Sequence, residues 1–256
     1  MRFRLLLQLR SEISGNAIPK SYGYDISEWI YGVFNRNEQT MSHWMTVNKI
    51  GRGPLDFQHF CYALQLEKVR VETFKLFLES PYAELYLSFW PETGTEELVR
   101  TLFDDQHIVV GNPVTRAVFA ITQIDLLETP ILEHVIFKTL SPIRLLLHRS
   151  DETAISMSPD TGNYGELLFQ NLIKKYQLLY GIPFSGVTSF QFQLASPPVM
   201  QTIILKPETK NEQKLRAFHV SFRMDADPVL LKIGYETGFG IDNSFGFGLV
   251  KAESQM

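Results

Sequence analysis

Residues 234–250 read GYETGFGIDNSFGFGLV, with glycines at positions 234, 238, 240, 246 and 248. Glycine accepts positive φ and has no side chain, so a backbone or a ligand can approach such a segment closely and its amides can face an anion. A second interpretation is structural, with a glycine that ends a helix followed by a bulged strand. The dinucleotide-binding fingerprint fits poorly, because no βαβ unit follows these glycines.

The residues before this segment predict one cycle of strands and helices. Working back from it, the sequence contains a helix (DPVLLKIGYETG), an alternating strand (LRAFHVSFRM), two strands (MQTIILK and FQFQL), a long helix (GELLFQNLIKKYQLLYG) and a strand (HVIFKTLSPIRLLLH). Alternation in LRAFHVSFRM places Arg216 on the apolar face, and His219 and Arg223 on the face available to a ligand. Lys174 and Lys175 are expected on the solvated side of the long helix.

The first half of the chain repeats the same order. RFRLLLQL is a strand, and a helix capped by Asp25 follows, with a break near Asn35; three strand patterns lead to a second helix capped by Thr95 and then to further strands. The order βαββαβ therefore appears twice, which is the ferredoxin-like plan. The predicted fold class is α+β, with tandem ferredoxin-like domains at residues 1–128 and 129–256 and a C-terminal glycine-rich loop.

Bulk properties limit the class of protein. The 256 residues are 45% hydrophobic and 20% charged, as in soluble globular proteins. No apolar stretch approaches the roughly 18 residues that span a bilayer, so a cytoplasmic protein without a membrane partner is expected. The net charge of -4 argues against nonspecific coating of nucleic acid, so any nucleic acid must bind a local basic patch.

Three segments carry a family resemblance. They are LLKIGYETGFGIDNSFGFGLV at 230–250, TLSPIRLL at 139–146 and MSPDTGNYGELLFQNLIKKYQLLYG at 157–181. Together they resemble the C-terminal signature of the CRISPR-associated repeat-RNA endoribonucleases, within the repeat-associated mysterious protein superfamily. The resemblance covers most of the second half, while the first half matches more loosely, through its element order, a helical tyrosine and a histidine after it.

The resemblance implies a function. Such a protein binds CRISPR repeat RNA and cuts the precursor crRNA once per repeat, without a metal or another cofactor. The 2'-hydroxyl attacks the adjacent phosphate and leaves 2',3'-cyclic phosphate and 5'-hydroxyl ends. An interference ribonucleoprotein complex is a candidate further partner, and a homodimer is one candidate oligomeric state.

This cut needs a base, an acid and a group that stabilises the charge on phosphorus. Histidine suits the proton transfers because its ordinary pKa lies near neutrality. The resemblance places the family's catalytic trio at Tyr31, His43 and Lys49, with Arg52 as a substitute for the lysine. Each has a plainer interpretation: Tyr31 as an amphipathic helix residue, His43 as a surface histidine and Lys49 as a solvated loop charge.

Residues that bind RNA are predicted mainly in the second half. A basic hairpin and the glycine-rich loop correspond to the family's RNA-binding elements, although a solvated charged hairpin is the alternative. The predicted RNA contacts are Arg52, Lys138, Arg144, Lys206, Lys214, Arg216, His219, Arg223, Gly238, Gly240, Asn243, Ser244, Gly246 and Gly248. A non-cleaving RNA-binding subunit and a metabolic α+β enzyme with a phosphate-binding loop are the competing functions. No residue spacing indicates a metal site.

Overall fold

A computed structural model of the chain describes residues 1–48, 50, 59–148 and 154–254. The chain forms two compact units. Unit 1 comprises Met1–Asp56, Ala63–Glu128 and Ile204–Gln213, and unit 2 comprises Phe57–Tyr62, Thr129–Ile203 and Lys214–Met256. Helices and strands are mixed in both, which confirms the α+β class.

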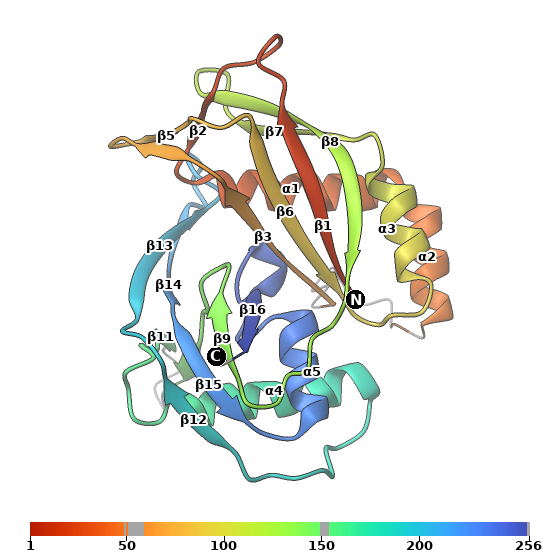
Figure 1. Cartoon of the computed structure of the whole chain (residues 1–256), viewed down its shortest axis with the longest axis vertical. Coiled ribbons are helices and arrows are strands. Elements are labelled where there is room, and N and C mark those ends of the chain that lie inside the picture. The colour runs from red at the N-terminus through yellow and green to blue at the C-terminus, as the bar shows by residue number, and fades with distance from the viewer. Residues whose placement is uncertain (49, 51–58, 149–153, 255–256) are drawn as a thin grey trace. The chain divides into compact units, whose positions relative to one another are not determined.

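The first half of the chain builds a five-stranded sheet in the order β3-β6-β1-β8-β7, and a small sheet in the order β2-β5-β4. Its elements are β1 (Arg2–Leu9), β2 (Ala17–Pro19), α1 (Tyr22–Arg36), α2 (Glu38–Val47), β3 (Phe60–Leu66), β4 (Val69–Val71), β5 (Lys75–Leu78), β6 (Tyr82–Phe89), α3 (Thr95–Phe103), β7 (His107–Gly111) and β8 (Arg116–Leu127). Alternate β1 side chains, Phe3, Leu5 and Leu7, are buried on one face. Helices α1 and α3 lie along the sheet, with α2 beside α3 (Figure 1).

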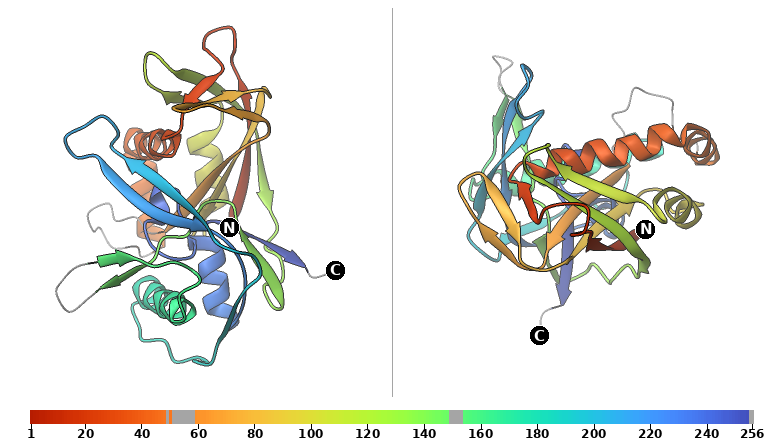
Figure 2. Two further views of the ribbon diagram at one scale, coloured as in Figure 1. Left: turned by 90° about the vertical axis from the view of Figure 1, so that its left-hand side faces the viewer. Right: turned by 90° about the horizontal axis from the view of Figure 1, so that it is seen from above.

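The second half builds a four-stranded sheet in the order β12-β15-β9-β16, and two hairpins, β10-β11 and β13-β14. Its elements are β9 (Val135–Thr139), β10 (Leu146–His148), β11 (Ala154–Ser156), α4 (Tyr164–Tyr180), β12 (Gln191–Leu194), β13 (Val199–Leu205), β14 (Gln213–His219), β15 (Ser221–Asp225), α5 (Pro228–Thr237), the 3-10 helix η1 (Asn243–Phe245) and β16 (Val250–Ser254). Helices α4 and α5 lie side by side, and β13 and β14 form a long two-stranded ribbon (Figure 2).

Aromatic side chains form the centre of the unit 2 core. The Phe137 ring lies 5.5 Å from the Phe222 ring and 5.2 Å from the Phe239 ring, between centroids. All three are fully buried. Strands β9 and β15 thus share one core with Phe239, the second residue after α5.

The predicted helix starts were wrong in detail. Helix α1 begins at Tyr22, three residues before Asp25, and the Asp25 carboxylate accepts a hydrogen bond from the Gly111 amide at 2.8 Å. Helix α3 begins at Thr95 itself, with Gly94 as the N-cap. In both cases the polar side chain satisfies another backbone group, which the local sequence does not reveal.

The predicted strand at 215–224 is two strands. Strand β14 ends at His219 and β15 begins at Ser221, in different sheets. The burial phase shifts between them, since Ala217 is buried in β14 whereas Val220 and Phe222 are buried after it. Arg216 is therefore exposed, and its predicted place on the apolar face was wrong.

A membrane-crossing helix is not found among the helices that the structure describes.

Phe137→Ala is expected to lower the free energy of unfolding by about 3 to 5 kcal/mol, because it removes a ring from a close-packed site and leaves a cavity. Urea denaturation followed by circular dichroism measures the change. Phe74→Ala is the matched control, since Phe74 is 85% exposed and its loss should change stability little. Equal effects of the two substitutions would contradict this description of the core.

Candidate functional site

The placement of His43 depends on a break between two helices. Asn37 ends α1 and precedes α2, and its side-chain amide donates to the Val33 carbonyl at 2.8 Å. After the break, Met41 and Trp44 turn inward and are buried. The predicted break near Asn35 lies two residues before the observed one at Asn37, and His43 follows the first helix as predicted, within α2.

Trp44 anchors α2 against the start of α3. Its indole N-H donates to the Thr95 hydroxyl at 3.1 Å, and that hydroxyl donates to the Pro91 carbonyl at 2.5 Å. The indole also packs edge-on to Phe89, with ring centroids 6.5 Å apart. Because His43 is the preceding residue, this buried anchor fixes the helix that presents the imidazole.

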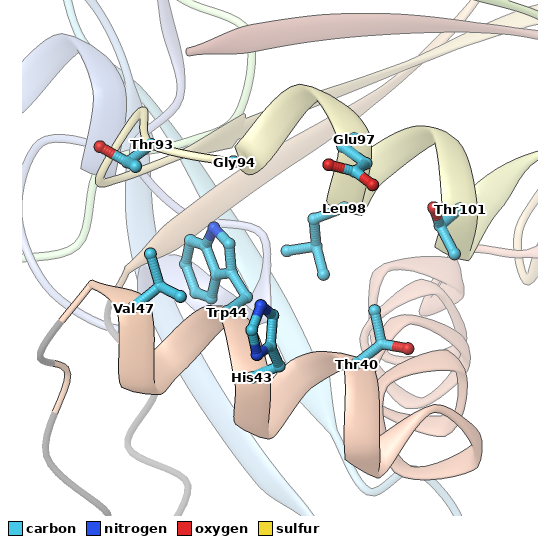
Figure 3. A pocket seen from close by; sticks show the side chains of 9 residues that line it. All are labelled: Thr40, His43, Trp44, Val47, Thr93, Gly94, Glu97, Leu98 and Thr101. Carbon is cyan, nitrogen blue, oxygen red and sulfur yellow. The ribbon is translucent and has the colours of Figure 1, made fainter.

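A groove between α2 and α3 receives the His43 side chain. It has a volume of about 360 Å³ and is lined by Thr40, His43, Trp44, Val47, Thr93, Gly94, Glu97, Leu98 and Thr101. His43 and Glu97 come from opposite walls, with Leu98 between them and Trp44 beside His43 (Figure 3). Both titratable groups are exposed, so an imidazole and a carboxylate are accessible to the same ligand.

The described residues do not assemble the predicted catalytic trio. Tyr31 lies on α1, half-buried, with its ring edge-on to Phe34 at 6.2 Å, and it does not line the groove. Lys49 and Arg52 lie outside the described residues. The roles of Tyr31, His43 and Lys49 stay predictions. Glu97 was missed, because nothing in GTEELVRTLFDD indicates which side chain faces α2.

In unit 2, residues 238–248 form a closed loop, called here the glycine-rich turn. The Phe239 amide donates to the Gly248 carbonyl at 2.8 Å. This hydrogen bond closes the neck of the turn, where residues 239 and 248 meet. The Asn243 side-chain amide also links the two sides, because it donates to the carbonyls of Phe239 at 3.1 Å and Phe247 at 3.0 Å. Both phenylalanines are fully buried, so the turn is part of the packed interior.

The glycines of the turn are required by its own packing. Gly238, Gly240, Gly246 and Gly248 all have positive φ, between 78° and 88°. A Cβ at Gly248 would lie 2.0 Å from the Phe239 carbonyl oxygen, and a Cβ at Gly240 would lie 2.4 Å from the Arg144 carbonyl oxygen. Protein atoms thus fill the space that a ligand was expected to use at these two positions. Of the turn residues predicted to contact RNA, Gly246 is the least enclosed, being half-buried.

Arg144 holds the turn to its own segment, TLSPIRLL at 139–146. Its guanidinium forms an ion pair with Asp242, and its carbonyl accepts from the Ile241 amide at 2.9 Å. The Arg144 side chain is only 15% exposed. Its charge is neutralised within unit 2, which weakens its predicted role as a phosphate contact.

Lys175 was expected on the solvated face of its helix, and this was wrong. Only 5% of the residue is exposed, and Nζ donates to the Gly238 carbonyl and, at 2.6 Å, to the Asn243 side-chain oxygen. Burial lowers the pKa of the Lys175 amine to about 7. The helical phase could have indicated this, because Lys175 follows the buried Leu168 and Leu172 at spacings of seven and three.

The other predicted RNA contacts differ in exposure. Lys206, Lys214 and Arg216 of the β13–β14 hairpin and Lys138 of β9 are exposed, and Arg223 is half-buried. His219 is half-buried, with Nδ1 3.2 Å from the Thr139 hydroxyl and Nε2 2.8 Å from the Gln201 side-chain oxygen. Burial lowers the pKa of His219. The hairpin cations are thus the most accessible of these groups.

Within the described ranges, no three His, Cys, Asp or Glu side chains gather as ligands of one metal ion.

Gly248→Ala is expected to destabilise the protein by about 3 kcal/mol or more, because it adds a steric clash to the cost of positive φ. Gly181→Ala is the matched control, since Gly181 has φ of +69° but no atom within 4 Å of the added Cβ. It should cost only about 1 kcal/mol. Urea denaturation of both variants makes the comparison, and equal losses would contradict the packed neck.

Comparisons with known proteins agree with one another. Residues 127–252 match the family described as CRISPR associated protein Cas6, C-terminal. CRISPR-associated endoribonuclease Cas6 1 of Methanocaldococcus jannaschii is 27% identical over 252 residues, covering 96% of this chain and 91% of the relative. CRISPR-associated endoribonuclease Cas6 of Pyrococcus furiosus is 26% identical, covering 99% and 90%. A solved structure described as CRISPR associated protein Cas6 is 26% identical, with a TM-score of 0.77 and 99% coverage of both chains. Over nearly its full length the chain is thus similar to Cas6 proteins, and residues 127–252 match the C-terminal family model of Cas6.

Proposed function

We propose that this protein is an endoribonuclease that binds CRISPR repeat RNA and processes precursor crRNA into guide units. The match of residues 127–252 to the Cas6 C-terminal family model and the names of the two curated relatives support the activity. The observation that carries the proposal in this chain is the exposed His43 in the α2–α3 groove, opposite the Glu97 carboxylate. Two proton-transfer groups that one ligand can reach suit acid-base cleavage of RNA.

The proposed reaction is attack of the 2'-hydroxyl on the adjacent phosphorus. The bond from phosphorus to the 5'-oxygen breaks, which leaves a 2',3'-cyclic phosphate and a 5'-hydroxyl. His43 transfers a proton at the scissile phosphate, Tyr31 positions or deprotonates the 2'-hydroxyl, and Lys49 or Arg52 stabilises the charge on phosphorus. The reaction needs no metal ion, because these side chains provide the proton transfers and the positive charge.

We also propose tandem ferredoxin-like domains, at residues 1–128 and 129–256. Similar strand orders support this plan. In the first half β3-β6-β1-β8 places the strands in the order second, third, first and fourth, with β7 added at the edge; β12-β15-β9-β16 gives the same order in the second half. Helices α1 and α3, and then α4 and α5, follow the first and third strands of each set, as βαββαβ requires.

The parent protein is expected to cut repeat RNA once, in EDTA, and to leave a cyclic phosphate that resists phosphatase until acid opens it. His43→Ala should lower the single-turnover rate by about 10² to 10⁴, the usual contribution of one acid-base group. Gel electrophoresis of end-labelled RNA measures rate and product.

The control is His107→Ala, because His107 is an exposed histidine of the same unit and lies outside the groove. Binding without cutting by the parent protein would instead identify a non-cleaving RNA-binding subunit. Nucleotide binding without affinity for repeat RNA would identify a metabolic enzyme.

The β13–β14 hairpin is the proposed RNA-holding surface, together with Lys138 and the half-buried Arg223. Lys214 and Arg216 are exposed and separated by one residue, so they lie on the same side of β14, and Lys206 follows β13 directly. Such a row of accessible cations suits the phosphates of one strand.

Lys214→Ala is expected to weaken repeat-RNA binding and to reduce the salt dependence, the slope of log K against log salt, by about 0.7 for one lost phosphate contact. Titrations between low and moderate salt measure the slope. Lys174→Ala removes an equal charge from the exposed side of α4 and should leave the slope unchanged. An unchanged slope in Lys214→Ala would remove the hairpin from the binding surface.

A further inference from the structure

Lys175 is a buried amine that the proposed reaction does not use. It lies on α4 with 5% of its surface exposed, and both of its hydrogen-bond acceptors belong to the glycine-rich turn. The first is the carbonyl of Gly238, where α5 ends, and the second is the side-chain oxygen of Asn243, where η1 begins. One amine thus joins the start of the turn to its middle.

Burial of this lysine costs free energy that burial of an apolar side chain would not. A lysine amine loses its hydration inside a protein, and the described part of the chain supplies no carboxylate in an ion pair with Nζ. Burial lowers the pKa of Lys175 to about 7, so the neutral amine is well populated near neutral pH. A neutral amine keeps two N-H donors, and two acceptors are present.

The Asn243 side chain depends on the Lys175 amine for the donor to its oxygen. Its Nδ2 holds the carbonyls of Phe239 and Phe247 together, which requires that its oxygen point toward Lys175. Without the amine, the buried oxygen would have no donor, and a buried acceptor without a partner costs about 1 to 3 kcal/mol. The closed turn would then compete with open arrangements.

We infer that Lys175 is a positioning residue for repeat RNA, which holds the glycine-rich turn in its closed shape before RNA arrives and touches no RNA itself. This inference rests on the proposed function and on the predicted RNA contact at Gly246, the predicted contact of the turn that protein atoms enclose least. Asp242, Phe245 and Gly246 are half-buried, and the amides of Phe245 and Gly246 donate to the carbonyls of Asp242 and Asn243, so the hold on Asn243 also orders these residues. A preorganised turn binds more tightly because less of the binding energy is spent on ordering it.

The test compares Lys175→Met with Lys174→Met. Methionine fills the space of the lysine stem without its amine, and Lys174 is the exposed neighbour on the same helix. Repeat RNA with a 2'-deoxy group at the cleaved position serves as the probe for affinity. If the closed turn falls to roughly a tenth of the population, Kd should rise about tenfold in Lys175→Met. The single-turnover rate of cleavage at saturating RNA should stay within about twofold of the rate in Lys174→Met, since RNA binding restores the turn.

Amide hydrogen exchange of residues 240–246 without RNA provides a second readout. These amides should exchange slowly in the parent and in Lys174→Met, and close to the rate of an unprotected amide in Lys175→Met. Equal RNA affinity and equal exchange in the two variants would overturn the inference. A proportional loss in all properties, including global stability, would show a general folding role and would also overturn it.

If Lys175→Met does not fold, amide protection in the parent protein, measured without and with RNA, provides the test. Protection of residues 240–246 that is already complete without RNA supports a preorganised turn, whereas protection gained only in the complex refutes it. Failure of the proposed function has a different signature, because the parent would then bind no repeat RNA although its turn stayed protected.

Discussion

The close approach of two backbone segments at the neck of the glycine-rich turn is the constraint on which unit 2 depends. The Phe239 amide reaches the Gly248 carbonyl, and only a residue without Cβ fits at position 248. The neck lets Phe239 and Phe247 enter the interior together, and Phe239 then packs on Phe137. The turn is therefore built as part of the core, and its glycines serve the packing of the chain against itself.

The basic side chains near this turn and those of the β13–β14 hairpin differ in their environment. Arg144 and Lys175 are basic side chains that bond to the turn, so they shape it and contribute little long-range field. The exposed cations of the β13–β14 hairpin lie at the surface, where a phosphate can reach them. With a net charge of -4, the chain depends on this local separation to bind a polyanion.

The sequence predicts the order of strands and helices well, because hydrophobic periodicity is a local property and survives folding. Prediction from the sequence fails where the contacts of a side chain depend on residues far away in the chain. Asp25 caps the Gly111 amide instead of its own helix, and the shift in phase between Ala217 and Val220 exposes Arg216. Lys175 was assigned by residue type against its helical phase. The sequence does not indicate the His43 groove: the histidine was named from the resemblance, and the place of Glu97 depends on how α2 packs on α3.

Both candidate functional elements depend on a buried side chain. Trp44, which is buried and hydrogen-bonded to Thr95, fixes the helix that carries His43, and the buried Lys175 bonds to the glycine-rich turn. A helix turns by about 100° per residue, so adjacent positions place one side chain in the interior and the next at the surface. The buried side chain fixes the helix, so the accessible group next to it is held in a defined position without an entropy cost of its own. Substitution of a buried neighbour can therefore change RNA processing although that neighbour never contacts RNA.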